Sequence, residues 1–262
     1  MVAALRALLG EHGVTTASLS RGYGGRFKGP LRIDSEIHTA SEVGDEPLML
    51  AAKGETWIGR NKVETARAMC DGRQCVVLLD DGHQNPTLQK DLSLVVIDAA
   101  APFGNGHVIP KGPLREPISR GLGRADGIVL MGTGQVPDEI SASGLPSFRA
   151  RLERTTPIPS GPLIAFAGIG RPDRFYEHLR QDGGDVRDTL SFADHHRYSR
   201  TELRRLHEWA IAHEATLVTT EKDFVRLPIE ARPGITPIKV RAVFDDPKPL
   251  IDLILPHIKG SN

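Results

Sequence analysis

The segment from Cys75 to Asn85 constrains the fold more than any other part of the chain. Four apolar residues run directly into Asp80 and Asp81, and a glycine follows. A short apolar run bounded by a turn signal predicts a strand buried on both faces, as in parallel sheets. Ligands of such sheets bind beyond the carboxyl ends of the strands. Two aspartates there could hold Mg²⁺, which prefers oxygen ligands and leaves room for substrate phosphates. The alternative is an ordinary Asp-Gly turn.

The rest of the chain alternates between strand-like and helix-like patterns. Strands are predicted over 14–19, 56–58, 92–98, 127–131, 163–167, 186–192, 215–219 and 238–243, and helices over 62–70, 173–181, 201–214 and 250–258. This alternation predicts an α/β protein with a parallel sheet and right-handed crossovers. Between 132 and 161 the composition turns to Gly, Pro, Ser and Thr. We therefore expect a core domain over 1–145, a linker over 146–160 and a smaller α/β domain over 161–262.

Composition excludes several classes of protein. The 33 basic and 33 acidic residues balance, so charge gives no argument for a nucleic-acid partner, and none is expected. Two cysteines, Cys70 and Cys75, cannot form a disulfide framework and fit a reducing cytosol. Nothing in their spacing suggests zinc. The sequence contains no apolar run near the roughly 18 residues that span a bilayer.

Polar clusters follow predicted strands or precede predicted helices. They are Asp80 with Asp81, Asp45 with Glu46, Asp194 with His195, and residues 221–223, with Arg21, Arg60 and Arg115 in loops. Carboxylates for a metal, a histidine for proton transfer and arginines for phosphate are the components of phosphoryl transfer. Each cluster also has an ordinary interpretation. Asp45 and Glu46, for example, precede Pro47 and a predicted helix over 48–52, where helix capping alone would account for them.

Six motifs occur in a fixed order along the chain. They are Ser20-Arg-Gly-Tyr-Gly-Gly25, Val43-Gly-Asp-Glu-Pro47, Leu79-Asp-Asp-Gly-His-Gln84, Gly104-Asn-Gly106 with Gly112-Pro-Leu-Arg-Glu-Pro117, Phe192-Ala-Asp-His-His196 and Thr220-Glu-Lys-Asp223. Together they resemble the tetraacyldisaccharide 4′-kinases of lipid A biosynthesis. The resemblance runs from Met1 to about Leu227, and the order of six separate motifs makes it specific.

The resemblance implies a lipid kinase that transfers the γ-phosphoryl group of ATP to the 4′-hydroxyl of a tetraacylated glucosamine disaccharide. The implied cofactors and partners are ATP, Mg²⁺, this lipid A precursor and a membrane surface. The implied location is the cytoplasmic face of the inner membrane of a Gram-negative bacterium, with peripheral attachment. The implied fold is a P-loop-NTPase-like parallel sheet core with a smaller α/β domain and an active site between them.

Site residues follow from the resemblance, motif by motif. Asp80 and Asp81 resemble the acids that handle Mg²⁺, and Asp45 resembles the base that takes the proton from the sugar hydroxyl. His195 resembles the histidine that pairs with this aspartate, and such a pair is suited to proton transfer because each group orients and tunes the other. The remaining matches are Gln84, Arg115 and Glu116 for the nucleotide, and Tyr23, Glu46 and Arg60 for the acceptor substrate.

Two departures from the family pattern stand out. His83 and Asn85 flank Gln84, where the family often has an aromatic residue and a histidine. The sequence also contains no Gly-Lys pair, which a Walker A loop requires for phosphate binding. Because Met1 to Gly10 resembles the helix that follows this loop, we expect the loop and its strand to be missing. A start codon assigned too late would explain this and predicts an in-frame upstream Gly-Lys-Thr or Gly-Lys-Ser loop, which an upstream stop codon would contradict.

Two other functions remain open at this stage. The chain could be a non-enzymatic remnant that binds a glycolipid or an anionic saccharide through its arginines. In that case it would bind an acylated disaccharide without phosphorylating it. Alternatively, the triplet Asp194-His195-His196 occurs in a family of Mn²⁺-dependent phosphoesterases. Such sites need further aspartates and histidines on neighbouring strands, which only the segment from Asp80 to His83 could supply.

Overall fold

The chain folds into two compact units that interleave along the sequence. The computed structural model describes residues 1–72 and 75–259. The first unit contains Met1–Ser20, Asn61–Glu153 and the segment from Arg241 onward, and the second contains Arg21–Arg60 and Arg154–Val240. This division differs from the expected continuous core domain over 1–145, because residues 21–60 pack with residues 154–240 in one unit. No helix in the described ranges is long and apolar enough to cross a bilayer.

The first unit contains the strand that leads to the two aspartates. Strand β4 (Val76–Leu79) pairs in parallel with β1 (Thr16–Ser20). All five residues of β1 are buried, whereas those of β4 are half-buried, so the prediction that β4 is buried on both faces is wrong. β4 lies at the end of its sheet, with a hydrogen-bonded strand on one side, which leaves it more exposed. Helix α4 (Lys62–Cys70) precedes it, and Asn61 caps this helix by accepting from the backbone N–H of Glu64.

A second sheet of the first unit has the strand order β12-β7-β6-β5. Its strands are β5 (Leu94–Asp98), β6 (Gly127–Met131), β7 (Ser147–Arg154) and β12 (Val240–Phe244), and its helices are α5 (Ile118–Leu122), α6 (Asp138–Ser143) and α10 (Lys248–Lys259). Helix α1 (Val2–Glu11) adds Leu8 and Leu9 to a core formed with Phe148 and Leu250. The expected linker over 146–160 is wrong where β7 runs, because this segment pairs in parallel with β6.

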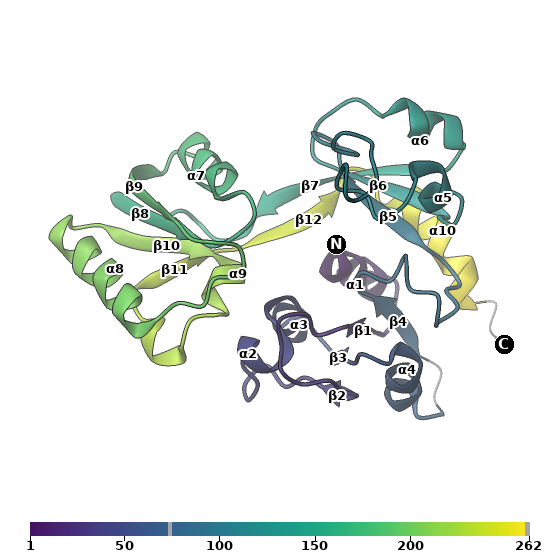
Figure 1. The fold of residues 1–262 in the computed structure, drawn as a ribbon, viewed down its shortest axis with the longest axis horizontal. Coiled ribbons are helices and arrows are strands. Elements are labelled where there is room, and N and C mark those ends of the chain that lie inside the picture. The colour runs from purple at the N-terminus through teal and green to yellow at the C-terminus, as the bar shows by residue number, and fades with distance from the viewer. Residues whose placement is uncertain (73–74, 260–262) are drawn as a thin grey trace. The chain divides into compact units, whose positions relative to one another are not determined.

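The sheet of the second unit is entirely parallel, as the sequence predicted, with the order β11-β10-β8-β9. Its elements are β8 (Pro162–Ala167), α7 (Pro172–Gln181), β9 (Asp185–Ser191), α8 (Arg200–Ala212), β10 (Thr216–Thr220) and β11 (Ile235–Ile238). Along β8, Leu163 and Ala165 pack in a cluster with α7, while Ile164 and Phe166 pack in a cluster with α8. Because side chains alternate across a strand, α7 and α8 cover opposite faces (Figure 1).

The segment 21–60 completes the second unit. It contains β2 (Leu31–Arg32), α2 (Ala40–Val43), α3 (Asp45–Ala51) and β3 (Thr56–Ile58), and β2 pairs with β3 in antiparallel fashion. Its core of Ile33, Val43, Leu48 and Ile58 contacts Val225, which directly follows α9 (Glu221–Phe224). This apolar contact packs α2 and α3 against the end of α9.

Cys70 and Cys75 form a disulfide that joins the end of α4 to the segment before β4. Two cysteines are too few for a disulfide framework, so the sequence alone favours reduced thiols. The structure corrects that expectation for this pair. A single short-range bridge needs only two cysteines whose Cα atoms lie close together, and here they are 5.7 Å apart.

Candidate active site

The carboxylate of Asp45 lies at the centre of a buried polar cluster in the second unit. Asp45 is the first residue of α3 and is 6% exposed. Its Oδ1 accepts a hydrogen bond from the backbone N–H of Glu46 at 3.0 Å. Its Oδ2 lies 3.1 Å from Nδ1 of His195 and accepts from Nε of Arg226 at 2.8 Å. The structure thus brings Asp45 and His195 together, and both belong to one compact unit rather than to two domains.

Gly44 sets the position of Asp45 at the start of α3. Its φ of +93° and ψ of 151° are accessible almost only to glycine. A Cβ atom on Gly44 would lie 2.5 Å from the carbonyl oxygen of Tyr23, and one on Gly25 would lie 2.6 Å from that of Glu42. The glycine-rich loop therefore packs backbone against backbone on the junction of α2 and α3. Gly25 and Gly44 are therefore needed for close packing of the backbone. The sequence alone does not distinguish this role from that of glycines in an ordinary turn.

Replacing Gly44 with Ala is expected to lower the free energy of unfolding by about 3 kcal/mol, since backbone strain adds to a steric clash. Gly24 provides a matched control because its φ of +79° is also positive, but no atom beyond its chain neighbours lies within 4 Å of the position that a Cβ would take. The Gly24→Ala change should cost only about 1–2 kcal/mol from strain. Urea denaturation followed by circular dichroism measures the free energy of unfolding of both variants. Equal decreases would contradict the role given to the contact between Gly44 and the carbonyl oxygen of Tyr23.

Asp45 is held in its ionised form by its neighbours. Burial raises the pKa of Asp45, but the hydrogen bonds and charge of Arg226, with the charges of Lys222 and His195, lower it further than burial raises it. The net effect is a pKa below the ordinary value for aspartate. Asp45 is therefore a carboxylate at neutral pH. Helix capping accounts only for its Oδ1, because Oδ2 faces the side chains of His195 and Arg226.

His195 presents one ring nitrogen to Asp45 and the other to Lys222. Its backbone has a left-handed φ of 58°, and its Nε2 lies 3.3 Å from Nζ of Lys222. Because a lysine ammonium group only donates hydrogen bonds, Nε2 accepts and Nδ1 donates to Asp45 when the imidazole is neutral. Lys222 also pairs with Glu46 at 3.3 Å, and the ring of Tyr23 meets the imidazole edge-on at 5.8 Å. The neighbours of His195 thereby select one tautomer.

A cavity of about 680 Å³ opens beside this cluster. Its lining includes Tyr23, Asp45, Asp194, His195, Arg197 and Arg226. All of these residues belong to the second unit. Glu46 is exposed next to Asp45, whereas Arg60 follows β3 and lies outside the described lining of this cavity. The structure thus groups Tyr23 and Glu46 with the Asp45–His195 pair but does not group Arg60 with them.

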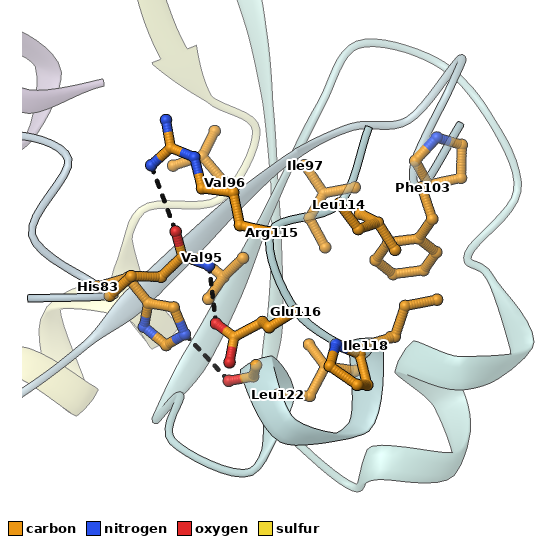
Figure 2. A pocket seen from close by; sticks show the side chains of 14 residues that line it. His83, Val95, Val96, Ile97, Phe103, Leu114, Arg115, Glu116, Ile118 and Leu122 are labelled. Carbon is orange, nitrogen blue, oxygen red and sulfur yellow. Dashed lines mark hydrogen bonds between the residues drawn. The ribbon is translucent and has the colours of Figure 1, made fainter. Parts of the chain in front are cut away.

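The first unit carries the other predicted residues, around the end of β4. Gln84 donates from Nε2 to Glu116 at 2.8 Å and accepts at Oε1 from Arg115 at 3.3 Å (Figure 2). Arg115 also lies 3.5 Å from Oδ2 of Asp81, and Oδ2 of Asp80 accepts from Ser20 at 3.3 Å. The structure therefore brings together Asp81, Gln84, Arg115 and Glu116, which come from two segments of the chain about 30 residues apart.

Glu116 is firmly anionic in this arrangement. Hydrogen bonds from Arg124 and then Gln84 lower its pKa to about 2. Behind it lies a pocket of about 210 Å³ whose wall is largely apolar and includes Val95, Phe103, Leu114 and Ile118 (Figure 2). His83, which departs from the family pattern, hydrogen-bonds to Ser93 and to the carbonyl oxygen of Gly121, so it ties the loop after β4 to α5.

The acids at the end of β4 suit a magnesium ion that is shared with phosphate. No group of three or more His, Cys, Asp or Glu residues able to hold a metal occurs within the ranges that the structure describes. Magnesium in phosphoryl-transfer sites often has only one or two protein carboxylates and takes its remaining ligands from phosphate and water. The adjacent pair Asp80 and Asp81 fits that donor set. A binuclear hydrolase site needs more protein ligands than this pair supplies.

Arg226 and Asp223 are parts of the cluster that sequence reasoning missed. Asp223 belongs to the motif Thr220-Glu-Lys-Asp223, whereas Arg226 lies outside all six motifs. Asp223 lies in α9, and Arg226 follows this helix three residues later. This spacing allows an ion pair, in which Nη1 of Arg226 lies 2.9 Å from Oδ1 of Asp223. Acidic and basic residues three positions apart are common on solvent-exposed helices, so the sequence alone does not distinguish this buried pair from an ordinary surface pair.

Comparison with known proteins assigns the chain to a family. The family model described as Tetraacyldisaccharide-1-P 4′-kinase matches residues 1–259. A protein from Hyphomonas neptunium named tetraacyldisaccharide 4′-kinase is 53% identical over 98% of this chain and 77% of its own length. One of the same name from Rhodospirillum centenum is 44% identical over 98% of this chain and 78% of its own length.

A solved structure supports the fold. It is described as "apo" form LpxK from Aquifex aeolicus in complex with ATP, and it matches with a TM-score of 0.77 at 24% identity, over 98% of this chain and 82% of that chain. The similarity confirms the predicted α/β fold with parallel sheets. Neither a phosphoesterase nor a non-enzymatic remnant is favoured by these matches. The chain belongs to the tetraacyldisaccharide-1-P 4′-kinase family, the phosphotransferases that phosphorylate an alcohol group in lipid A biosynthesis.

Proposed function

We propose that the Asp45–His195 pair of this chain accepts the proton of the acceptor hydroxyl during 4′-phosphorylation of a tetraacylated glucosamine disaccharide. The observation that carries the proposal is the 3.1 Å contact between Oδ2 of Asp45 and Nδ1 of His195 on the wall of a 680 Å³ cavity. A hydroxyl becomes a better nucleophile as its proton is removed, and a positioned acid–base pair supplies about 10²–10⁴-fold in rate. Both groups are fixed by further hydrogen bonds, which suits such a role.

The proposed reaction transfers one phosphoryl group and one proton. The 4′-oxygen forms a bond to the γ-phosphorus of ATP while the bond from that phosphorus to the β,γ-bridging oxygen breaks, and ADP leaves. The hydroxyl proton passes to the Asp45–His195 pair. In this proposal the fixed charges around the pair, Arg226 and Lys222 among them, stay in place throughout, so little reorganisation accompanies the step.

ATP and magnesium are proposed to bind at the end of β4. Asp80 and Asp81 would hold Mg²⁺, which neutralises phosphate charge when bound, and Gln84, Arg115 and Glu116 would contact the nucleotide. The hydrogen-bonded array of these side chains supports the proposal, as does the ATP complex described for the Aquifex aeolicus structure. Tyr23, Glu46 and Arg60 are proposed for the acceptor.

The proposed acceptor also suggests where the protein works. A disaccharide with four acyl chains stays in a bilayer, because each buried methylene group contributes about 0.8 kcal/mol. The protein must therefore meet its substrate at a membrane surface, and we propose peripheral attachment at the cytoplasmic face of the inner membrane, where ATP is present. Co-sedimentation of the protein with anionic lipid vesicles measures this attachment.

The experiment that tests the function uses the full-length protein, γ-labelled ATP, Mg²⁺ and tetraacyldisaccharide 1-phosphate. Mass spectrometry should find one added phosphate on the lipid, at the 4′ position. The His195→Asn change should lower kcat by about 10²-fold or more. His207 is the matched control, because it lies in the same unit and its Nε2 contacts a backbone carbonyl oxygen, that of Ala231. Equal activity of the His195 and His207 variants would contradict the proposal.

A further inference from the structure

We propose that Arg226 is a positioning residue for the Asp45–His195 pair and that Asp223 anchors it. This inference rests on the proposed function of the pair. Arg226 comes directly after α9, and its side chain is 6% exposed. An arginine this deeply buried needs partners for its nitrogens, and their identity shows what it holds in place.

The guanidinium group of Arg226 connects two carboxylates. On one side Nε donates to Oδ2 of Asp45 at 2.8 Å, and Nη2 lies 2.6 Å from the same oxygen. On the other side Nη1 donates to Oδ1 of Asp223 at 2.9 Å and to the carbonyl oxygen of Gly168 at 2.8 Å. The planar group is therefore held at both ends. Its contacts with Oδ2 of Asp45 keep this oxygen in position to contact Nδ1 of His195.

Asp223 is itself fixed by the sheet. It is fully buried, and its Oδ1 accepts from the backbone N–H of Gly168 at 3.0 Å and from the hydroxyl of Tyr198 at 2.8 Å. Thr220 donates to its Oδ2 at 2.6 Å. Burial and the nearby Asp223 carboxylate raise the pKa of Tyr198, so its phenol keeps the proton that it donates. These contacts tie Arg226 to the ends of β8 and β10.

The arrangement explains why arginine suits this position better than lysine. Guanidinium nitrogens point in several fixed directions within one plane, so one side chain reaches Asp45, Asp223 and Gly168 together. A lysine ammonium group carries the same charge at a single point. It would preserve the charge beside Asp45 but could not span both carboxylates. Charge and geometry can therefore be separated by substitution.

The test measures kcat, KM and the pH dependence of kcat for Arg226→Lys and Arg226→Gln in the full-length protein. Both variants should lose about 10–10²-fold in kcat with KM within about threefold, because the pair is misplaced rather than the substrate. In Arg226→Gln the pH below which kcat falls should also move upward, since the main group that lowers the pKa of Asp45 is gone. In Arg226→Lys this shift should be smaller.

Arg232 provides the matched control, because it lies in the same unit and donates to the backbone carbonyl oxygens of Leu227 and Val225. Arg232→Lys should change kcat by less than about threefold without moving the pH profile. An unchanged kcat in Arg226→Lys would overturn the inference. If Arg226→Gln does not fold, Arg226→Lys alone decides the outcome by its kcat.

Asp45→Asn separates failure of this inference from failure of the proposed function. If Asp45→Asn is fully active, the proposed function has failed. If Asp45→Asn is inactive while the Arg226 variants match Arg232→Lys, only the positioning role has failed. Nitrogen-15 shifts of the His195 ring give a readout independent of turnover. The wild type should show a protonated Nδ1, and Arg226→Gln should show a mixture of tautomers if Arg226 positions Asp45.

Discussion

Replacing Asp45 with Asn is expected to lower kcat for phosphoryl transfer by about 10²–10⁴-fold, the range supplied by acid–base groups. Asparagine keeps the size of the side chain but removes the negative charge that receives the Nδ1–H of His195 and the guanidinium group of Arg226. An amide can also present its NH₂ group to Arg226, which would break the contact. The measurement is the initial rate of γ-phosphoryl transfer at saturating ATP and lipid.

Asp34→Asn is the matched control for this prediction. Asp34 lies in the same unit, is exposed, and accepts at Oδ1 only a local hydrogen bond from the backbone N–H of Glu36. Its kcat should stay within about twofold of the wild type, because surface changes away from such clusters have small effects. A kcat for Asp45→Asn within tenfold of the Asp34→Asn value would remove Asp45 from the proton-transfer step.

The same variant gives a second readout through the pH dependence of stability. The pKa of Asp45 is lowered in the folded protein, so its ionisation stabilises the fold above the unfolded pKa of about 3.9. That contribution is lost as the pH falls through the lower, folded value. The difference in unfolding free energy between wild type and Asp45→Asn should therefore be largest near pH 7 and shrink below about pH 4. Urea denaturation at several pH values measures it.

Local patterns in the sequence predicted the elements that have a clear apolar period. The bounds expected for 56–58, 62–70 and 127–131 match β3, α4 and β6. Strand β7 was missed because only Phe148 and Ala150 of its eight residues are buried, and its other side chains include three arginines and a glutamate. Such a strand owes its structure to pairing with its neighbours, which short-range patterns do not record.

The interleaving of the two units could not be read from local composition. A boundary rich in Gly, Pro and Ser suggested a continuous first domain, yet residues 21–60 pack with the C-terminal half through Val43, Leu48 and Val225. Each of these residues is an ordinary apolar side chain on a short helix or just beyond one. Their shared core depends on contacts between distant segments, for which the sequence alone carries no pairing signal.

The candidate site, too, could be predicted only in part from the sequence. The resemblance to the kinase family implied that Asp45 and His195 pair, although they lie 150 residues apart. Arg226 lies 181 residues from Asp45 and belongs to none of the motifs, so its contact was not predicted. The contact between Asp45 and His195 could thus be predicted from the resemblance, whereas the contact between Asp45 and Arg226 became visible only with the fold. Positioning residues are in general harder to predict because many side-chain arrangements can hold one carboxylate.

Replacing Asp223 with Ala is expected to lower the free energy of unfolding by about 3–5 kcal/mol, the usual cost of removing one partner of a buried ion pair. Asp223 is fully buried and accepts hydrogen bonds from Arg226, Tyr198 and the backbone of Gly168. Alanine would leave all three donors without this acceptor inside the protein, and each buried unsatisfied group adds a cost of about 1–3 kcal/mol.

Asp182→Ala is the control that separates burial from charge. Asp182 also pairs with an arginine of the second unit, Arg154, but its side chain is 46% exposed. Its removal should cost less than about 1 kcal/mol, because solvent screens exposed pairs. Urea denaturation followed by tryptophan fluorescence, which arises from Trp57 and Trp209, reports on the unit that contains both sites. If Asp223→Ala is no more than about 1 kcal/mol less stable than Asp182→Ala, Asp223 does not anchor Arg226. The packing of α3 would then have to account for the position of Asp45.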